Sequence, residues 1–211
     1  MKKTLLTFVA FFTLGLTSQV EAQVVEQGKV IVDGYYGFPN LYSSIFKTAY
    51  ANSGNELNLK IGSMGPVGIR GEYLISNKIG FGLDLGMNST ILTYSEPTQV
   101  YNSITDTYTT MNYDYTFKTQ KIGAIVTFNY HFIENDNFDA YFVFGAGYGN
   151  RTFDFKSTDP SYSASSIKSL IPVASKIGFG MRYFFTENIG ANLAVGAGQG
   201  GLVNIGLSAK F

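Results

Sequence analysis

The end of the chain carries the feature that most restricts its fold. From position 203 to position 211, apolar side chains occupy every second position, and Asn204, Gly206, Ser208 and Lys210 stand between them. A period of two predicts a β-strand with one apolar face and one polar or small face. The same alternation recurs along most of the chain, so the sequence predicts an all-β protein.

Seven further segments repeat this pattern, which brings the expected number of strands to about eight. The segments are 30–38, 67–75, 79–87, 122–132, 140–148, 173–185 and 189–197. The connections alternate in length: 76–78, 133–139 and 186–188 are short, whereas 39–65, 95–115 and 155–170 are long. Short turns at one rim and long loops at the other are typical of membrane barrels. The connection near 199–201 departs from this rule because it is also short.

The N-terminus has the features of an export signal. Lys2 and Lys3 precede an uncharged run from 5 to 16, which is too short to cross a bilayer as a helix. Val20 and Ala22 stand at the positions that a signal peptidase reads, so we expect cleavage after Ala22. The expected organisation is a signal peptide at 1–22 and one barrel domain at 23–211.

Composition explains where the barrel belongs. The chain has 24 glycines and only 14% charged residues, and it has no cysteine, which excludes disulfides, thiolate metal sites and a lipid-modified N-terminal cysteine. The face opposite the apolar one carries few charges among many glycines: Asp33, Arg70, Glu72, Asp84, Lys121, Lys176, Arg182 and Lys210. Such a face suits a narrow lumen better than a water-facing surface. The sequence therefore predicts a membrane-spanning antiparallel up-and-down β-barrel, with short periplasmic turns and longer extracellular loops.

Two sets of residues are predicted to matter in this barrel. Charges inside a narrow lumen have to pair, so we expect an ionic network of Arg70, Glu72, Asp84, Lys176 and Arg182, with Glu72 and Arg182 nearer the short turns. Exposed loop aromatics are candidates for contact with a partner: Tyr94, Tyr101, Tyr108 and Tyr113. The alternation of Thr105, Thr107 and Thr109 is also compatible with a hairpin that protrudes above the membrane.

The chain resembles the family of small outer-membrane β-barrels typified by OmpA-like and OmpX-like proteins. The resemblance rests on the 182–190 hairpin, on 129–132 leading into 141–149, and on the terminal strand that ends in Phe211. It implies that Phe211 belongs to the signal read by the barrel-assembly machinery. It also implies contact with outer-membrane lipids and lipopolysaccharide in a Gram-negative cell.

Catalysis and cofactors are not expected. His131 is the only histidine, so multi-histidine metal sites are excluded, and we expect this residue at the rim near a periplasmic turn. The glycine-rich segments 145–149 and 196–201 lack the Lys-Ser/Thr of a phosphate loop and a following helix. No basic footprint for nucleic acid is present.

These observations favour a monomeric, non-enzymatic protein that supports the envelope or presents loops for adhesion or ligand contact. Three rival hypotheses stay open: a narrow channel, a lipid-modifying enzyme, and a soluble ligand-binding barrel of lipocalin type.

Overall fold

The computed structural model describes residues 25–50, 58–134 and 136–211. The predicted signal peptide lies outside the described residues. Nine strands and one helix are present in the described part of the chain. The elements are β1 Val30–Phe38, α2 Leu41–Ala49, β2 Lys60–Ser76, β3 Ile79–Asn102, β4 Thr107–Glu134, β5 Phe138–Ser157, β6 Ser165–Lys168, β7 Val173–Phe184, β8 Ile189–Gly198 and β9 Val203–Lys210.

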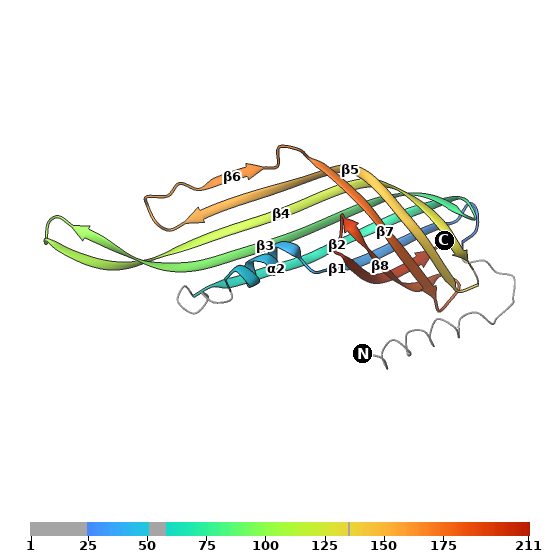
Figure 1. Cartoon of the computed structure of the whole chain (residues 1–211), viewed down its shortest axis with the longest axis horizontal. Coiled ribbons are helices and arrows are strands. Elements are labelled where there is room, and N and C mark those ends of the chain that lie inside the picture. Colours follow the sequence, from blue (N-terminus) through green and yellow to red (C-terminus); the bar gives the residue numbers. More distant parts are fainter. Residues whose placement is uncertain (1–24, 51–57, 135) are drawn as a thin grey trace.

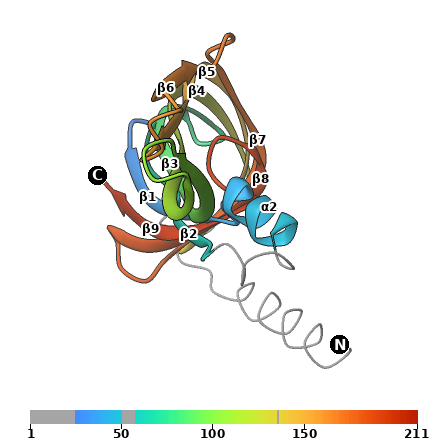
Figure 2. The same ribbon diagram turned by 90° about the vertical axis from the view of Figure 1, so that its left-hand side faces the viewer.

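Eight of the strands close into a ring. Every neighbouring pair is antiparallel, from β1–β2 through β3, β4, β5, β7, β8 and β9, and β1 pairs again with β9. Figure 2 looks into this ring from the end where the longest strands protrude. The predicted antiparallel up-and-down barrel is thereby confirmed. The ninth strand, β6, is an addition that pairs with β5 beyond the ring.

The strands are very unequal in length, and this is where the structure differs from the expected loops. β3, β4 and β5 have 24, 28 and 20 residues, whereas β9 has 8. Since about 9–11 residues cross a bilayer as a tilted strand, the long strands extend well beyond the barrel (Figure 1). The expected loop 95–115 is mostly strand, and 155–170 contains β6. These strands form beyond the barrel because β3 and β4 pair with each other along their whole length and β6 pairs with β5.

Within the barrel, the apolar face of each strand points outward and the charged face points inward. Leu83 and Val126, for example, are direct partners on β3 and β4 and have exposed fractions of 49% and 60%, while Asp84, the next residue of β3, is fully buried. Aromatic residues gather on the outer surface near the short turns: Tyr73, Tyr130, Phe132, Phe142, Tyr183, Phe185 and Phe211. An apolar outer band with an aromatic girdle is the surface that lipid requires.

The two faces exchange character where β3, β4 and β5 leave the barrel. On the outward face, Ile122 is followed at successive alternate positions by Gln120, Lys118 and Thr116. On the inward face, the lumen glycines give way to Phe117 and Tyr115 on β4 and to Phe153 and Phe155 on β5. An apolar outer face suits lipid, and an apolar inner face under a polar outer one suits water. The exchange therefore marks the edge of the membrane-spanning part.

Helix α2 lies in the segment 39–65, which was expected to be a loop. Asn40 caps its N-terminus by accepting a hydrogen bond from Ser43 N, and the Asn40 side chain is also bonded to Thr90 Oγ1. Tyr42 and Phe46 of the helix contact Phe153 and Phe117, with ring centroids 6.2 and 5.8 Å apart. The helix thus covers the aromatic inner face of the protruding sheet. No helix among the described residues is both long and apolar enough to cross a bilayer.

Candidate functional site

A charged plug fills the lumen. We use this name for Asp33, Arg70, Glu72, Asp84, His131, Asp139, Lys176 and Arg182, all of which are buried. The strands position these side chains because each projects from the inward, polar face of its strand.

Arg182 is the centre of the layer nearer the short turns. Its Nη2 lies 2.7 Å from Glu72 Oε2 and 2.8 Å from Asp33 Oδ2. Its Nη1 lies 3.0 Å from Asp139 Oδ2, and its ring of contacts is completed by Tyr141, whose aromatic face is 4.3 Å from the guanidinium carbon. One guanidinium therefore bridges three carboxylates that come from β1, β2 and β5.

Asp84 is the centre of the second layer, farther from the short turns. Its carboxylate accepts from Lys176 Nζ at 2.7 Å and from Arg70 Nε at 3.3 Å. The Tyr35 hydroxyl donates to it at 2.7 Å, and Gln199 Nε2 donates at 3.0 Å. Arg70 also reaches Asp33 at 3.4 Å, so the two layers form one network.

The structure therefore brings together all five residues that were predicted as an ionic network, and it adds three that were not. Asp33 was recognised on the polar face but was not placed in the network. Asp139 was placed in a turn, but it lies in β5 and is buried.

His131 is the clearest correction to the sequence analysis. It was expected at the rim, but it is fully buried between two carboxylates, with Nε2 2.8 Å from Glu72 Oε1 and Nδ1 2.7 Å from Asp139 Oδ1. A β-bulge between His131 and Ile133 alters the register at this point, and the histidine stays on the inward face. The side-chain hydrogen bonds of His131 go to these two carboxylates, and its ring lies 5.4 Å from that of Tyr141. The described residues contain no group of three or more His, Asp or Glu side chains suited to a metal ion.

Charge balance assigns a role to His131. Four carboxylates, Asp33, Glu72, Asp84 and Asp139, face three arginine and lysine side chains, Arg70, Lys176 and Arg182. Ionised carboxylates only accept hydrogen bonds, so with both carboxylates ionised we infer that both ring nitrogens of His131 donate. An imidazolium that donates from both nitrogens supplies the fourth positive charge.

Glycines make room for the large side chains of the plug. A Cβ atom at Gly80 would collide with the carboxylate of Glu72, and one at Gly180 would collide with the ring of Tyr141. The glycine-rich composition of the inward face is thus a steric requirement of a lumen this narrow.

The arrangement is inverted relative to a water-soluble protein, because charges form the interior and apolar side chains form the exterior. Only a surrounding lipid phase makes that arrangement stable. The chain is a membrane-spanning β-barrel.

Comparisons with known proteins give similarities of structure only. No protein-family model matches the chain, and no curated protein matches it. The chain is similar to the N-terminal β-barrel domain of OprF from Pseudomonas aeruginosa, with 14% identity over 88% of this chain and 98% of that one, and a TM-score of 0.43. It is also similar to Ail, the attachment invasion locus protein of Yersinia pestis, with 13% identity over 88% and 99% of the two chains and a TM-score of 0.39. A structure of Ail in complex with the heparin analogue sucrose octasulfate aligns with 15% identity and a TM-score of 0.36.

The four predicted contact tyrosines do not form one site. Tyr101 and Tyr108 pair near the tip of the β3–β4 hairpin, with ring centroids 5.2 Å apart, and both are exposed. The Tyr101 hydroxyl donates to Asp106, and this hydrogen bond raises the pKa of Tyr101. Tyr94 lies nearer the barrel and stacks on Tyr115 at 5.1 Å on the inner face. Tyr113 is half-buried.

Phe211 closes the seam between the first and last strands. Its N–H donates to Val30 O at 2.9 Å, and its O accepts from Val30 N at 3.1 Å. Its side chain is 68% exposed on the outside of the barrel. The backbone and the ring can therefore be tested separately.

We predict that Phe211→Ala reduces insertion into the outer membrane, because this change removes the aromatic ring and keeps the backbone hydrogen bonds of the seam. Phe211→Tyr is expected to insert normally. Phe185→Ala, at another exposed aromatic of the same rim, is the matched control. Quantitative immunoblots of separated outer membranes measure the effect, and normal insertion of Phe211→Ala would remove Phe211 from the assembly signal.

Proposed function

We propose that the protein is a monomeric, non-enzymatic barrel of the Gram-negative outer membrane, exported with a signal peptide at 1–22, that contacts other macromolecules through its protruding sheet. The short turns then face the periplasm, and β3, β4, β5 and β6 reach into the medium. The observation that carries this proposal is the free edge of β4 in the protruding sheet.

The protruding sheet is built as a water-soluble unit. Its outer face is polar, and its aromatic inner face is covered by α2 and by Tyr162, whose ring lies 5.7 Å from that of Tyr115. A hairpin of two strands alone is marginally stable in water, whereas packing against a helix and further strands stabilises it. A chain that needed only a membrane anchor would have no use for this second packed unit.

One edge of the sheet is left unpaired near its tip. β5 accompanies β4 as far as the pair Tyr115 and Ser157, and Thr158 N donates to Asp114 O at 3.0 Å. Beyond that point, no strand among the described residues pairs with the outer edge of 107–113. The segment contains no charge, proline or glycine and is rich in threonine and tyrosine. Proteins usually protect such an edge, so its presence favours strand addition by a partner.

The opposite edge of the hairpin is protected. β3 carries Glu96 and Pro97 there, and both residue types disfavour strand pairing. The contrast between the two edges supports contact on the β4 side in particular. It also accounts for the exposed Tyr101 and Tyr108, which lie beside that edge and can add aromatic contact area.

The charged plug supports this function over the rival hypothesis of a narrow channel. Arg182, Glu72 and Asp33 meet across the lumen and are each at most 2% exposed. An ion would have to separate these pairs in order to pass. Besides the partner that adds a strand to the β4 edge, we propose as partners outer-membrane lipids and lipopolysaccharide around the barrel, and the barrel-assembly machinery during biogenesis.

The edge can be blocked by a single substitution. Asp114 directs its backbone groups toward β5, so Asn112, Thr110 and Tyr108, at the same alternate positions, direct theirs toward the free edge. Thr110→Pro removes one outward N–H and leaves the β3–β4 hydrogen bonds intact. We expect bacteria that display Thr110→Pro to lose the adhesion to cultured-cell monolayers and to serum-protein coatings that the wild-type barrel confers.

Thr110→Val is the matched control, because it keeps the N–H and nearly the same side-chain shape. It is expected to adhere like the wild type. Surface display of each variant is checked by antibody labelling of intact cells. Equal adhesion of Thr110→Pro and the wild type would contradict contact through this edge, and single-channel conductance of the purified wild type would favour the channel instead.

A further inference from the structure

Two cationic side chains lie side by side inside the mouth of the barrel. Lys121 of β4 and Arg151 of β5 are direct partners in the sheet and both project from the inward face. Lys121 lies between Gln120 and Ile122, where the outward face of β4 changes from apolar to polar side chains. The pair therefore lies at the outer edge of the membrane-spanning part. Both side chains are half-buried.

No acidic side chain in the described part of the chain forms an ion pair with either cation. Asp84, the acid of the upper plug layer, is already bonded to Lys176 and Arg70. Arg151 donates one hydrogen bond, to Thr119 Oγ1 at 3.0 Å, and its guanidinium lies 4.2 Å from the centre of the Tyr42 ring. Most of the five N–H donors of Arg151, and the ammonium of Lys121, have no carboxylate partner among the described residues.

Like charges at directly opposed positions in a sheet destabilise it. The three lysine and arginine cations of the charged plug are each matched with a carboxylate, and this pair differs from them. An anion bound between Lys121 and Arg151 would relieve the repulsion. The exception therefore points to a ligand.

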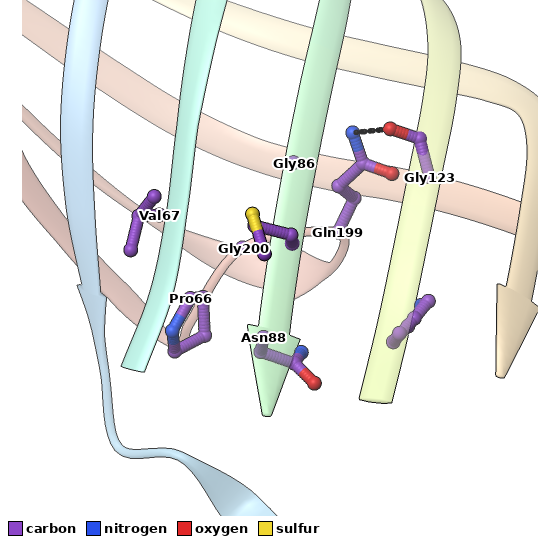
Figure 3. A pocket seen from close by; sticks show the side chains of 9 residues that line it. Pro66, Val67, Gly86, Asn88, Gly123, Gln199 and Gly200 are labelled. Carbon is purple, nitrogen blue, oxygen red and sulfur yellow. Dashed lines mark hydrogen bonds between the residues drawn. The ribbon is translucent and has the colours of Figure 1, made fainter. Parts of the chain in front are cut away.

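The surroundings indicate which anion fits. Lys121 lines a recess together with Asn88, Gly123 and Gln199. Figure 3 shows Gln199 reaching across the barrel to Gly123, where its Nε2 donates to Gly123 O at 3.4 Å. The Gln199 side chain is buried, and its Oε1 has no hydrogen-bond donor among the described residues. The recess thus offers an unpaired acceptor in the same lining as Lys121, whose direct partner on the neighbouring strand is Arg151.

We propose that the mouth of the barrel binds a phosphate group through Lys121 and Arg151. At neutral pH a phosphate presents acceptor oxygens to the two cations and a P–OH that donates to Gln199 Oε1. A sulfate has no such hydrogen. Arginine binds a phosphate through two parallel N–H donors, and lysine adds a point charge.

The position of the pair selects the source of the phosphate. Both cations face the lumen, whereas the phosphates of outer-leaflet lipids surround the barrel wall from outside. The ligand has to enter from the medium, as inorganic phosphate, which keeps a P–OH at neutral pH.

The test uses the full-length mature barrel, purified in a phospholipid-free detergent. We expect inorganic phosphate to raise its thermal midpoint in a concentration-dependent way, as any ligand specific to the folded state does, and sodium sulfate at equal ionic strength to raise it less. Lys121→Gln and Arg151→Gln should each weaken phosphate binding by about tenfold or more, as loss of a charge-assisted hydrogen bond implies. Lys121→Arg should retain binding. Lys118→Gln, which changes an outward-facing lysine of the same strand, should bind like the wild type.

Several outcomes would overturn the site. Equal midpoint shifts in wild type, Lys121→Gln and Arg151→Gln would show that phosphate acts elsewhere, and equal shifts with sulfate would remove the role of Gln199. Glu56 lies outside the described residues, so Glu56→Gln is included. This variant tests whether Glu56 neutralises the two cations in place of a ligand. If only Glu56→Gln is stabilised by phosphate, and the wild type is not, the proposal fails. A response to phosphatidic acid micelles without any response to inorganic phosphate would assign the pair to lipid, against the proposal.

Discussion

Arg182→Ala is expected to destabilise the barrel more than any other single substitution in the lumen. The guanidinium contacts Glu72, Asp33 and Asp139 at 2.7–3.0 Å, and its removal leaves three buried carboxylates without their shared cation. Removal of one partner of a buried ion pair typically costs about 3–5 kcal/mol. Glu72→Ala should cost less, because Arg182 keeps two of its carboxylates.

A double-mutant cycle distinguishes a direct interaction between Glu72 and Arg182 from two independent losses of stability. The Glu72→Ala and Arg182→Ala double variant is expected to recover part of the summed losses, with an interaction free energy of roughly 0.5–3 kcal/mol. The measurement is the temperature at which the folded, fast-migrating form disappears from a detergent gel. Lys118→Ala, on the outward face of the protruding sheet, controls for the loss of any positive charge. Strictly additive losses would mean that the two side chains do not stabilise one another.

His131→Leu is expected to have the second-largest effect. It removes one of the two side chains that join Glu72 to Asp139, at 2.8 and 2.7 Å, and among the described residues it leaves only Arg182 to join the two carboxylates. The expected loss is again about 3–5 kcal/mol, because a buried charge loses its partner. Adding Asp139→Asn should restore part of the stability by removing one of the two negative charges.

The protonation of His131 can be observed directly. The chain has a single histidine, so the ¹⁵N spectrum of a tag-free protein labelled on histidine reports this ring alone. We expect both ring nitrogens to carry protons at neutral pH. A neutral ring with one unprotonated nitrogen, or a His131→Leu variant as stable as the wild type, would contradict the charge balance of four cations and four carboxylates. His131→Gln, which keeps one donor, should have an intermediate stability.

The sequence indicated the class of fold because that class depends on local order. Alternation with a period of two is visible within a single strand, as from 203 to 211, and the choice between lipid and water as solvent follows from the bulk and charge of the two faces. Short turns such as 76–78 need only a few neighbouring residues. The closed ring of eight antiparallel strands agrees with these local signals.

The helix and the protruding sheet were harder to predict because local signals conflict there. The exchange of faces between Gln120 and Phe117 breaks the apolar period, so the region resembles a loop when it is read against the pattern of the membrane-spanning strands. A second alternation could have located the protruding sheet: aromatic residues stand at 115, 117, 153 and 155, on the face that carries polar and small residues within the barrel. Helix α2 shows a comparable signal, in which Asn40 precedes Tyr42 and Phe46 at a helical spacing.

By itself, the sequence determined that the strands alternate, that their apolar faces need lipid, and that the few inward charges have to find partners. Only the tertiary structure decided which charges meet. Arg182 contacts Asp33 across 149 positions of the chain, and His131 contacts Glu72 across 59. Partner choice depends on the register of all eight strands together, and a one-residue shift in any of them would move every side chain of that strand to the other face. His131 shows the consequence, because neighbouring residues placed it at the rim whereas the closed barrel places it between two carboxylates in the lumen.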